Sequence, residues 1–210
     1  VSNVTNMEAM FIEASAFNQN IGGWKVSNVT NMGVMFIEAS AFNQNIGDWD
    51  VSNVTNMNAM FALASAFNQN IGDWDVSNVA DMSYMFQEAS AFNQNIGGWD
   101  ITNAGSMTNI FYNSGISADN YDKILIAWDA AGYENKNLGD VSPLHYCAGE
   151  TARTSLLGKG WAINGDALGC TTTALVSNIN PSAENESVTF TATIAPSSAT
   201  GTVTFKDGII

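Results

Sequence analysis

The sequence has few of the residues that carry most enzyme chemistry. Its 210 residues include one histidine and two cysteines. His145 stands two positions before Cys147, which superficially suggests a base and a nucleophile, but the second cysteine, Cys170, favours a disulfide instead. No phosphate-binding loop, nucleophile elbow or zinc-ligand spacing occurs. The sequence therefore predicts a protein without catalytic activity.

Basic residues are also scarce, because six lysines and arginines face 20 aspartates and glutamates, for a formal net charge of −14. Such an acidic chain is a poor partner for nucleic acid or for anionic membrane surfaces. It is compatible with basic partners, with cations, or with a role of the charge in solubility alone. No apolar run is long enough to span a bilayer, which predicts no membrane insertion in this segment.

What the sequence does contain is a 25-residue repeat, seen most clearly from residue 21 to residue 45. Three columns of large apolar residues recur with this period: Trp24, Trp49, Trp74, Trp99; Met7, Met32, Met57, Met82, Met107; and Phe17, Phe42, Phe67, Phe92. A fixed period of this length is typical of stacked repeat proteins, whose units share one continuous core. The chain begins at Val1 inside this pattern, which indicates a fragment of a longer protein.

Each repeat is expected to contain a strand and a short helix. Trp24 and Val26 lie two residues apart, as on one side of a strand. The spacing i, i+3, i+4, i+7 then places four residues on one helix face: Met32, Met35, Phe36, Ala39. Stacking would give a parallel sheet on the inner curve, with the Met, Phe and Trp columns in the core.

Three columns of asparagine are expected to be structural ladders. They are Asn28, Asn53, Asn78, Asn103; Asn18, Asn43, Asn68, Asn93; and Asn20, Asn45, Asn70, Asn95. Asparagine side chains can bond to backbone groups of turns that lack other partners. The few positions that vary between repeats form two columns on the expected helical side: Glu8, Gly33, Asn58, Ser83; and Ala9, Val34, Ala59, Tyr84.

Three segments are predicted: repeats over residues 1–112, a C-terminal cap over 113–170, and a β segment over 171–210. In the cap, Ser117 is a good N-cap for a helix with an apolar face that ends at Gly132, with residues Tyr121, Ile124, Leu125, Trp128. A strand is expected over 136–141 and a second helix over 150–157.

The last segment shows the alternation of β-strands at residues 187–194 and 201–205, with Pro181 before the first stretch and Pro196 between the two. Forty residues are too few for a β-sandwich core, so the segment is predicted to be half of an immunoglobulin-like domain or to borrow support.

The two cysteines, Cys147 and Cys170, favour a disulfide and hence an exported protein. The bond would stabilise the fold by roughly 3 kcal/mol in the chain-entropy model. The alternative is two free buried thiols.

The candidate binding residues form an acidic stripe, expected to face outward from the sheet: Asp48, Asp50, Ser52, Asp73, Asp75, Ser77, Asp100, Thr102. Carboxylates of Asp50, Asp75 and Asp100 stacked at strand spacing would repel one another unless water, a cation or a basic partner offset the charge. The hypothesis is a partner-facing surface, and the alternative is a solvated face. Calcium is a possible cofactor, although no Gly-rich Asp loop of the calcium-repeat type is present.

The repeat WDVSNVTNMxxMFxxASAFNQNIGxW resembles the BspA-type leucine-rich repeats of bacterial surface proteins over residues 1–112. The following segment is similar to the end module of such proteins, and residues 171–210 resemble the first half of a bacterial immunoglobulin-like domain. The resemblance implies an α/β fold: a leucine-rich-repeat-like solenoid, an α/β cap and a partial all-β segment. It also implies an extracellular, cell-surface protein that adheres to a protein or glycan on another cell or matrix, or to neighbouring copies. The alternative is a structural stalk or fibre component without a ligand.

Overall fold

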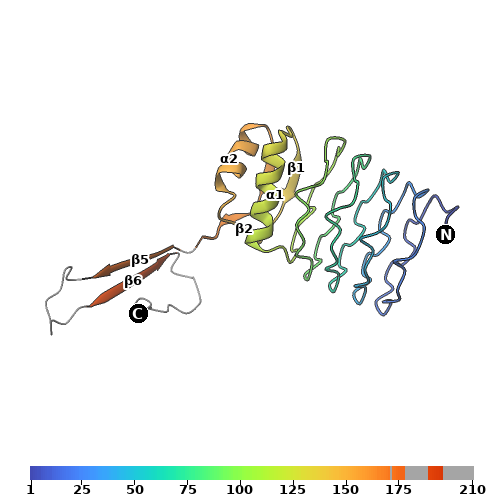
Figure 1. Ribbon diagram of the computed structural model, residues 1–210, viewed down its shortest axis with the longest axis horizontal. Coiled ribbons are helices and arrows are strands. Elements are labelled where there is room, and N and C mark those ends of the chain that lie inside the picture. The colour runs from blue at the N-terminus through green and yellow to red at the C-terminus, as the bar shows by residue number, and fades with distance from the viewer. Residues whose placement is uncertain (171, 178–188, 196–210) are drawn as a thin grey trace, which may run out of the picture. The chain divides into compact units, whose positions relative to one another are not determined.

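The structure is a computed structural model that describes residues 1–170, 172–177 and 189–195. The chain divides into two compact units, Val1–Leu168 and Gly169–Ile210. In the first unit, a row of similar coils leads from the N-terminus to a helical segment that contains α1 and α2 (Figure 1).

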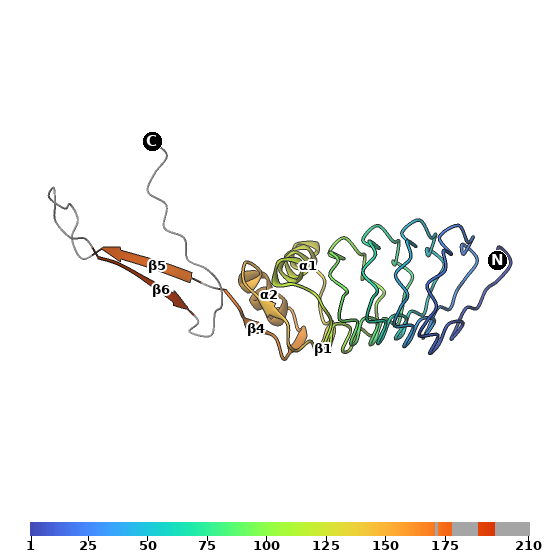
Figure 2. The same cartoon turned by 90° about the horizontal axis from the view of Figure 1, so that it is seen from below.

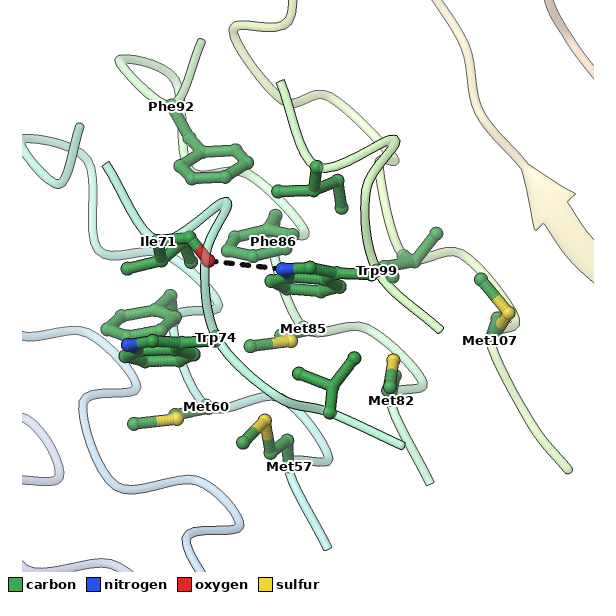
Figure 3. Close-up of a cluster of buried hydrophobic side chains, with 14 of the residues drawn as sticks. Met57, Met60, Ile71, Trp74, Met82, Met85, Phe86, Phe92, Trp99 and Met107 are labelled. Atoms are coloured by element: carbon green, nitrogen blue, oxygen red, sulfur yellow. Dashed lines mark hydrogen bonds between the residues drawn. The ribbon is translucent and has the colours of Figure 1, made fainter. Parts of the chain in front are cut away.

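The coils stack in register through columns of aromatic rings. Along the column Phe11, Phe36, Phe61, Phe86, Phe111, neighbouring ring centroids lie 5.3, 5.6, 5.9 and 6.3 Å apart. A second column, starting at Phe17 and Phe42, has spacings of 5.8, 6.0 and 6.1 Å. The methionine and tryptophan columns are buried beside them, apart from the half-buried Trp24, and the indole N–H of Trp99 donates to the Ile71 carbonyl (Figure 3). The predicted core columns are confirmed.

The regular backbone of the coils is a ladder of turns and not the predicted helix. Met32, Val34, Phe36 and Glu38 donate their N–H groups to the next coil, and Met35, Ile37 and Ala39 close turns onto residues three positions earlier. Single parallel bridges join successive coils, Asn6 to Asn31 to Asn56 to Asp81 to Ser106. We call residues 6–13, 31–38, 56–63, 81–88 and 106–113 the ladder segments; Figure 2 shows them aligned along one side, with β1 at the end of the row.

The helical spacing correctly predicted which residues are buried, but it predicted the wrong backbone conformation. Met32, Met35, Phe36 and Ala39 are all fully buried, as the spacing predicted. The same pattern of two inward and two outward residues arises here from overlapping turns, which close from Met35 to Met32, from Ile37 to Val34 and from Ala39 to Phe36. An in–out pattern of this kind cannot distinguish the two backbones.

The predicted strand at Trp24 and Val26 is also absent. This stretch is a loop with two turns, in which Trp24 donates its N–H to Ile21 and Val29 donates to Val26. The repeated Trp–x–Val segments therefore form no sheet, and the parallel hydrogen bonding lies on the ladder segments instead.

The three asparagine columns are structural, as predicted. Asn43 accepts the Asn68 backbone N–H at 3.0 Å, Asn45 accepts the Gly47 N–H at 2.9 Å, and Asn53 donates to the Ser27 carbonyl at 2.8 Å. Equivalent bonds recur in neighbouring coils. Each column thus satisfies backbone groups in loops that have no strand partner.

Helix α1 (Ala118–Ala131) has the predicted boundaries and face. The Ser117 side chain accepts from Asn120, Gly132 ends the helix with φ 78°, and the buried face contains Tyr121, Ile124, Leu125 and Trp128. The Trp128 ring stacks on Phe111 at 6.4 Å, and Trp161 lies 5.9 Å beyond it. The helix thereby continues the aromatic column and closes the end of the stack.

The remainder of the cap continues the ladder. Strand β1 (Asn137–Asp140) accepts from the last ladder segment, where Asn109 donates to Leu138 at 2.7 Å. It pairs in parallel with β3 (Ala162–Asn164), and β2 (His145–Tyr146) pairs in parallel with β4 (Ala167–Leu168). Helix α2 (Glu150–Gly158) packs beside α1, and both β1 and α2 match their predicted positions.

The second unit contains β5 (Thr172–Ser177) and β6 (Phe190–Ala195), which pair antiparallel with Thr172 opposite Ala195. Strand β6 coincides with much of the alternation predicted at 187–194. The strand predicted at 201–205 lies outside the described residues. Both cysteines, Cys147 and Cys170, are disulfide-bonded, which confirms the predicted disulfide.

Candidate binding surface

The side chains that differ most between coils lie on the ladder segments. Within each segment, two pairs of positions alternate with the buried methionines and phenylalanines, and we call the side chains at these positions the ladder face. Coil by coil they are Glu8, Ala9, Ile12, Glu13; Gly33, Val34, Ile37, Glu38; Asn58, Ala59, Ala62, Leu63; Ser83, Tyr84, Gln87, Glu88; and Thr108, Asn109, Tyr112, Asn113. The variable columns thus lie where the backbone is most regular.

Apolar side chains are exposed on this face. Tyr84 is 40% exposed, and Val34, Ile37 and Leu63 are half-buried. Ile12 is 46% exposed on the first coil, where Met10 is exposed as well although its equivalents Met35 and Met60 are buried. The residues that we call the strip lie on four successive coils and are Ile12, Val34, Ile37, Leu63, Tyr84. In the third coil Ala59 and Ala62 are buried and only Leu63 contributes. Exposed apolar groups that lie together are typical of a contact surface, whereas single ones are not.

One edge of this strip is an acidic column. Glu13, Glu38 and Glu88 occupy the same ladder position in three coils, with Leu63 between them. Their carboxylates make no hydrogen bond or ion pair within the described part of the chain. The ion pairs found there all lie in the cap, between Lys123 and Asp119, Arg153 and Asp166, and Lys159 and Asp129.

Two columns of the ladder face have a strained backbone. The φ angles are positive at Ala9, Val34, Ala59, Tyr84 and at Glu13, Glu38, Leu63, Glu88. Glycine and asparagine tolerate this left-handed conformation best, yet among these coils neither residue occupies either column. The last ladder segment does follow the preference, with Asn109 and Asn113 at these positions. Strain that is kept beside an exposed surface favours a functional use of the side chains.

The residues of the predicted acidic stripe do not lie on the hydrogen-bonded ladder segments. They lie in the Trp–x–Val loops. In this loop Asp75 Oδ1 accepts the Ser77 hydroxyl at 2.6 Å and the Ser77 N–H at 3.1 Å, and Asp50 and Asp100 bond Ser52 and Thr102 in the same way. These bonds, the hydroxyl bond first, lower the pKa of Asp75 and of Asp100. The expectation of a sheet position is wrong, and these three aspartates each stabilise their own turn.

The other stripe residues, Asp48 and Asp73, are exposed and make no such bond. Asp48 and Asp50 border a hollow of about 420 Å³, whose other walls include Trp24 and Lys25. At the far end of the stripe, Lys136 donates to the Thr102 and Ala104 carbonyls, and burial lowers the pKa of Lys136.

No arrangement for a metal ion is found in residues 1–170, 172–177 and 189–195, where no three histidine, cysteine, aspartate or glutamate side chains come close enough to share an ion. Calcium therefore gains no support from the geometry.

The sequence did not identify the ladder face as a candidate binding surface, because it predicted the sheet on the Trp–x–Val segments. The signal that could have identified it is the internal variation at Glu8, Gly33, Asn58 and Ser83 and at their neighbours. That variation was assigned to a helical side, since the in–out pattern is the same for both backbones.

The geometry defines the class as a stacked-repeat protein with one hydrogen-bonded ladder and a helical cap. The chain belongs to the family described as "Mycoplasma protein of unknown function, DUF285", a bacterial family whose model matches residues 5–128, more than half of the chain. The match covers the coils and extends to Trp128, the residue that closes the aromatic column. No curated protein and no solved structure matches the chain.

Among the described residues, no helix combines the length and the apolar character needed to cross a bilayer.

Proposed function

We propose that this chain is a non-catalytic, extracellular protein of the bacterial surface that adheres to a protein or glycan partner through the ladder face. In this proposal the coils are a leucine-rich-repeat-like solenoid, residues 113–170 are its cap, and residues 171–210 begin an immunoglobulin-like domain. The disulfide supports an exported location, because disulfides persist in oxidising environments.

The observation that carries the proposal is a contrast within the repeat. Buried and turn-capping residues are nearly the same in every coil, whereas the ladder face changes from coil to coil. If the coils served only as a spacer, the outward positions would need no such variety, and residues suited to the left-handed conformation would serve best. Variety on one face of a rigid stack is typical of a binding surface.

A second candidate is a structural stalk of the cell surface without a ligand on this segment. The near identity of the coils favours it, because identical units extend a stack without changing its geometry. In that case the acidic residues serve solubility.

An adhesion assay with two matched variants separates these candidates. Beads coated with the chain are tested for attachment to immobilised matrix proteins, to a glycan array and to cultured host cells. We expect attachment that is lost in Ile37→Ser/Tyr84→Ser and retained in Asp48→Asn/Asp73→Asn. Loss in the second variant alone would return the site to the acidic stripe, and no attachment to any surface would favour the stalk.

A further inference from the structure

We infer that the ladder face binds a basic, amphipathic polypeptide segment, whose apolar residues cover the strip and whose lysines or arginines meet Glu13, Glu38 and Glu88. This inference rests on the proposed function and specifies the partner's chemistry.

The first support is the arrangement of the two chemistries on one surface. The apolar strip contains Ile12, Val34, Ile37 and Tyr84, and glutamates occupy the last position of the first, second and fourth ladder segments. Neighbouring rungs of a parallel ladder lie about 4.8 Å apart, close to the pitch of a helix laid along the stack. Apolar and acidic columns side by side fit a partner with apolar and basic sides.

The second support is the absence of cations near the acidic column. Lys25 is the only basic residue of residues 1–113, and it borders the hollow beside Asp48 and Asp50, on a Trp–x–Val loop. Glu13, Glu38 and Glu88 therefore have no intramolecular counter-ion within the described residues. Glu13 and Glu38 occupy the same position on neighbouring coils, where like charges repel, and a partner's cations would relieve this repulsion.

The third support concerns how the partner is held. The backbone groups of the ladder segments already hydrogen-bond to neighbouring coils, since the Val34 N–H donates to the Asn58 carbonyl and the Glu38 N–H donates to the Ala62 carbonyl. No strand can therefore be added across this face, and recognition must come from side chains. The left-handed positions Val34, Tyr84, Glu38 and Glu88 are those that supply the required side chains, which accounts for the absence of glycine there.

A glycan fits this face less well than a polypeptide. The strip exposes aliphatic groups and one strongly exposed aromatic ring, Tyr84, and the acidic column would repel acidic sugars. Neutral sugars would leave the three carboxylates unpaired.

The inference is tested with defined probes and the full chain. The main probe is a synthetic peptide with leucines along one helical face and lysines beside them. Three control probes are the same peptide with glutamate for lysine, oligolysine, and a chitosan oligosaccharide as a cationic glycan. Affinities are measured by calorimetry at two salt concentrations.

Two triple variants with equal changes of charge serve as the comparison. Glu13→Gln/Glu38→Gln/Glu88→Gln removes the acidic column, and Asp48→Asn/Asp73→Asn/Glu134→Gln removes three exposed carboxylates elsewhere on the same chain. Circular dichroism checks that both fold as the unaltered chain does. We expect the first triple to weaken binding of the leucine–lysine peptide by about tenfold or more, and the second to change it less than about threefold. Oligolysine should bind more weakly than the peptide.

Equal losses in both triples would overturn the inference, because they would show general attraction to an acidic chain. Binding of the glutamate peptide, or of chitosan in preference to the leucine–lysine peptide, would overturn it as well. In that event, attachment of coated beads that depends on Ile37 and Tyr84 would still uphold the proposed function, whereas absent attachment would defeat both.

Discussion

At the scale of single residues, the unusual feature is a set of ordinary side chains in the left-handed conformation. Val34 has φ 51°, and β-branched residues rarely adopt such angles because the branched Cβ crowds the backbone. The stack imposes this conformation, since Val34 both donates to the next coil and closes a turn with Ile37. Residues other than glycine or asparagine occupy this left-handed position in each of the first four coils, at a cost in conformational energy. Stability alone therefore does not determine which residues occur there.

Replacing Val34 with glycine should therefore stabilise the protein. A left-handed L-residue costs roughly 1–2 kcal/mol, and glycine loses about 0.5–1 kcal/mol through backbone entropy, so we expect a gain of about 0.5–1 kcal/mol. Ile37→Gly is the matched control, because Ile37 is half-buried on the same ladder segment with an ordinary φ, and it should destabilise by about 1 kcal/mol. Urea unfolding followed by tryptophan fluorescence measures both, and equal destabilisation would contradict the strain argument.

At the scale of elements, local signals predicted the cap well and the coils poorly. Ser117, Gly132 and the apolar face of α1 specify a helix by short-range chemistry, and the structure has it at the predicted residues. In the coils, the same kind of spacing from Met32 to Ala39 is produced by turns whose hydrogen bonds run to residues 24 positions away. Because that backbone conformation depends on hydrogen bonds to a neighbouring coil, it could not be predicted from the residue pattern within one repeat. The acidic stripe was misplaced for the same reason.

Helix α2 shows a contact that no local signal could predict. Its N-cap residue, Gly149, has no side chain to cap the helix, and the carboxylate of Asp122 from α1 takes this role. Asp122, which is 6% exposed, accepts N–H groups of Cys147 at 2.8 Å, Ala148 at 2.8 Å and Gly149 at 2.9 Å. The carboxylate thus holds the start of α2 against α1.

Asp122→Asn should destabilise the cap by about 2–3 kcal/mol, although it changes few atoms. One oxygen of the amide can still accept from Cys147 and Gly149, but its NH₂ group would face the Ala148 N–H, so two donors would oppose each other inside the protein. Asp119→Asn, which removes an exposed pair with Lys123, should cost less than about 0.5 kcal/mol. Urea unfolding followed by far-ultraviolet circular dichroism compares them, and a cost for Asp122→Asn as small as that of Asp119→Asn would show that α2 needs no cap.

At the scale of the whole stack, the ladder has a direction. Every second N–H group of the first four ladder segments donates to a carbonyl group of the following coil, as Ala9 donates to Gly33 and Val34 donates to Asn58. An ordinary strand edge presents both kinds of group and can pair with a copy of itself. Two like edges of this ladder would bring carbonyl against carbonyl, so coils can be added in one direction only. The cap meets this requirement, since Leu138 and Ser142 supply the carbonyls that accept from the last ladder segment.

Because each ladder segment must face an equivalent segment in register, the stack should tolerate the deletion of one whole repeat. It should not tolerate the deletion of one repeat minus one residue. Deletion of residues 58–82 joins Met57 to Ser83, which reproduces the natural Met82–Ser83 step, and it leaves each remaining coil facing an equivalent neighbour. We expect a cooperative fold of lower stability, because one coil and its share of the interfaces are removed.

Deletion of residues 59–82 retains one additional residue, Asn58, inside the ladder segment. From that point onward inward and outward positions are displaced, so that the equivalents of buried Met85 and Phe86 no longer face the core and the donors no longer oppose carbonyls. That chain should lose cooperative unfolding and near-ultraviolet circular dichroism, although it differs from the other by a single residue. Equal stability of the two deletions would mean that the loops absorb the shift and that the ladder does not set the register.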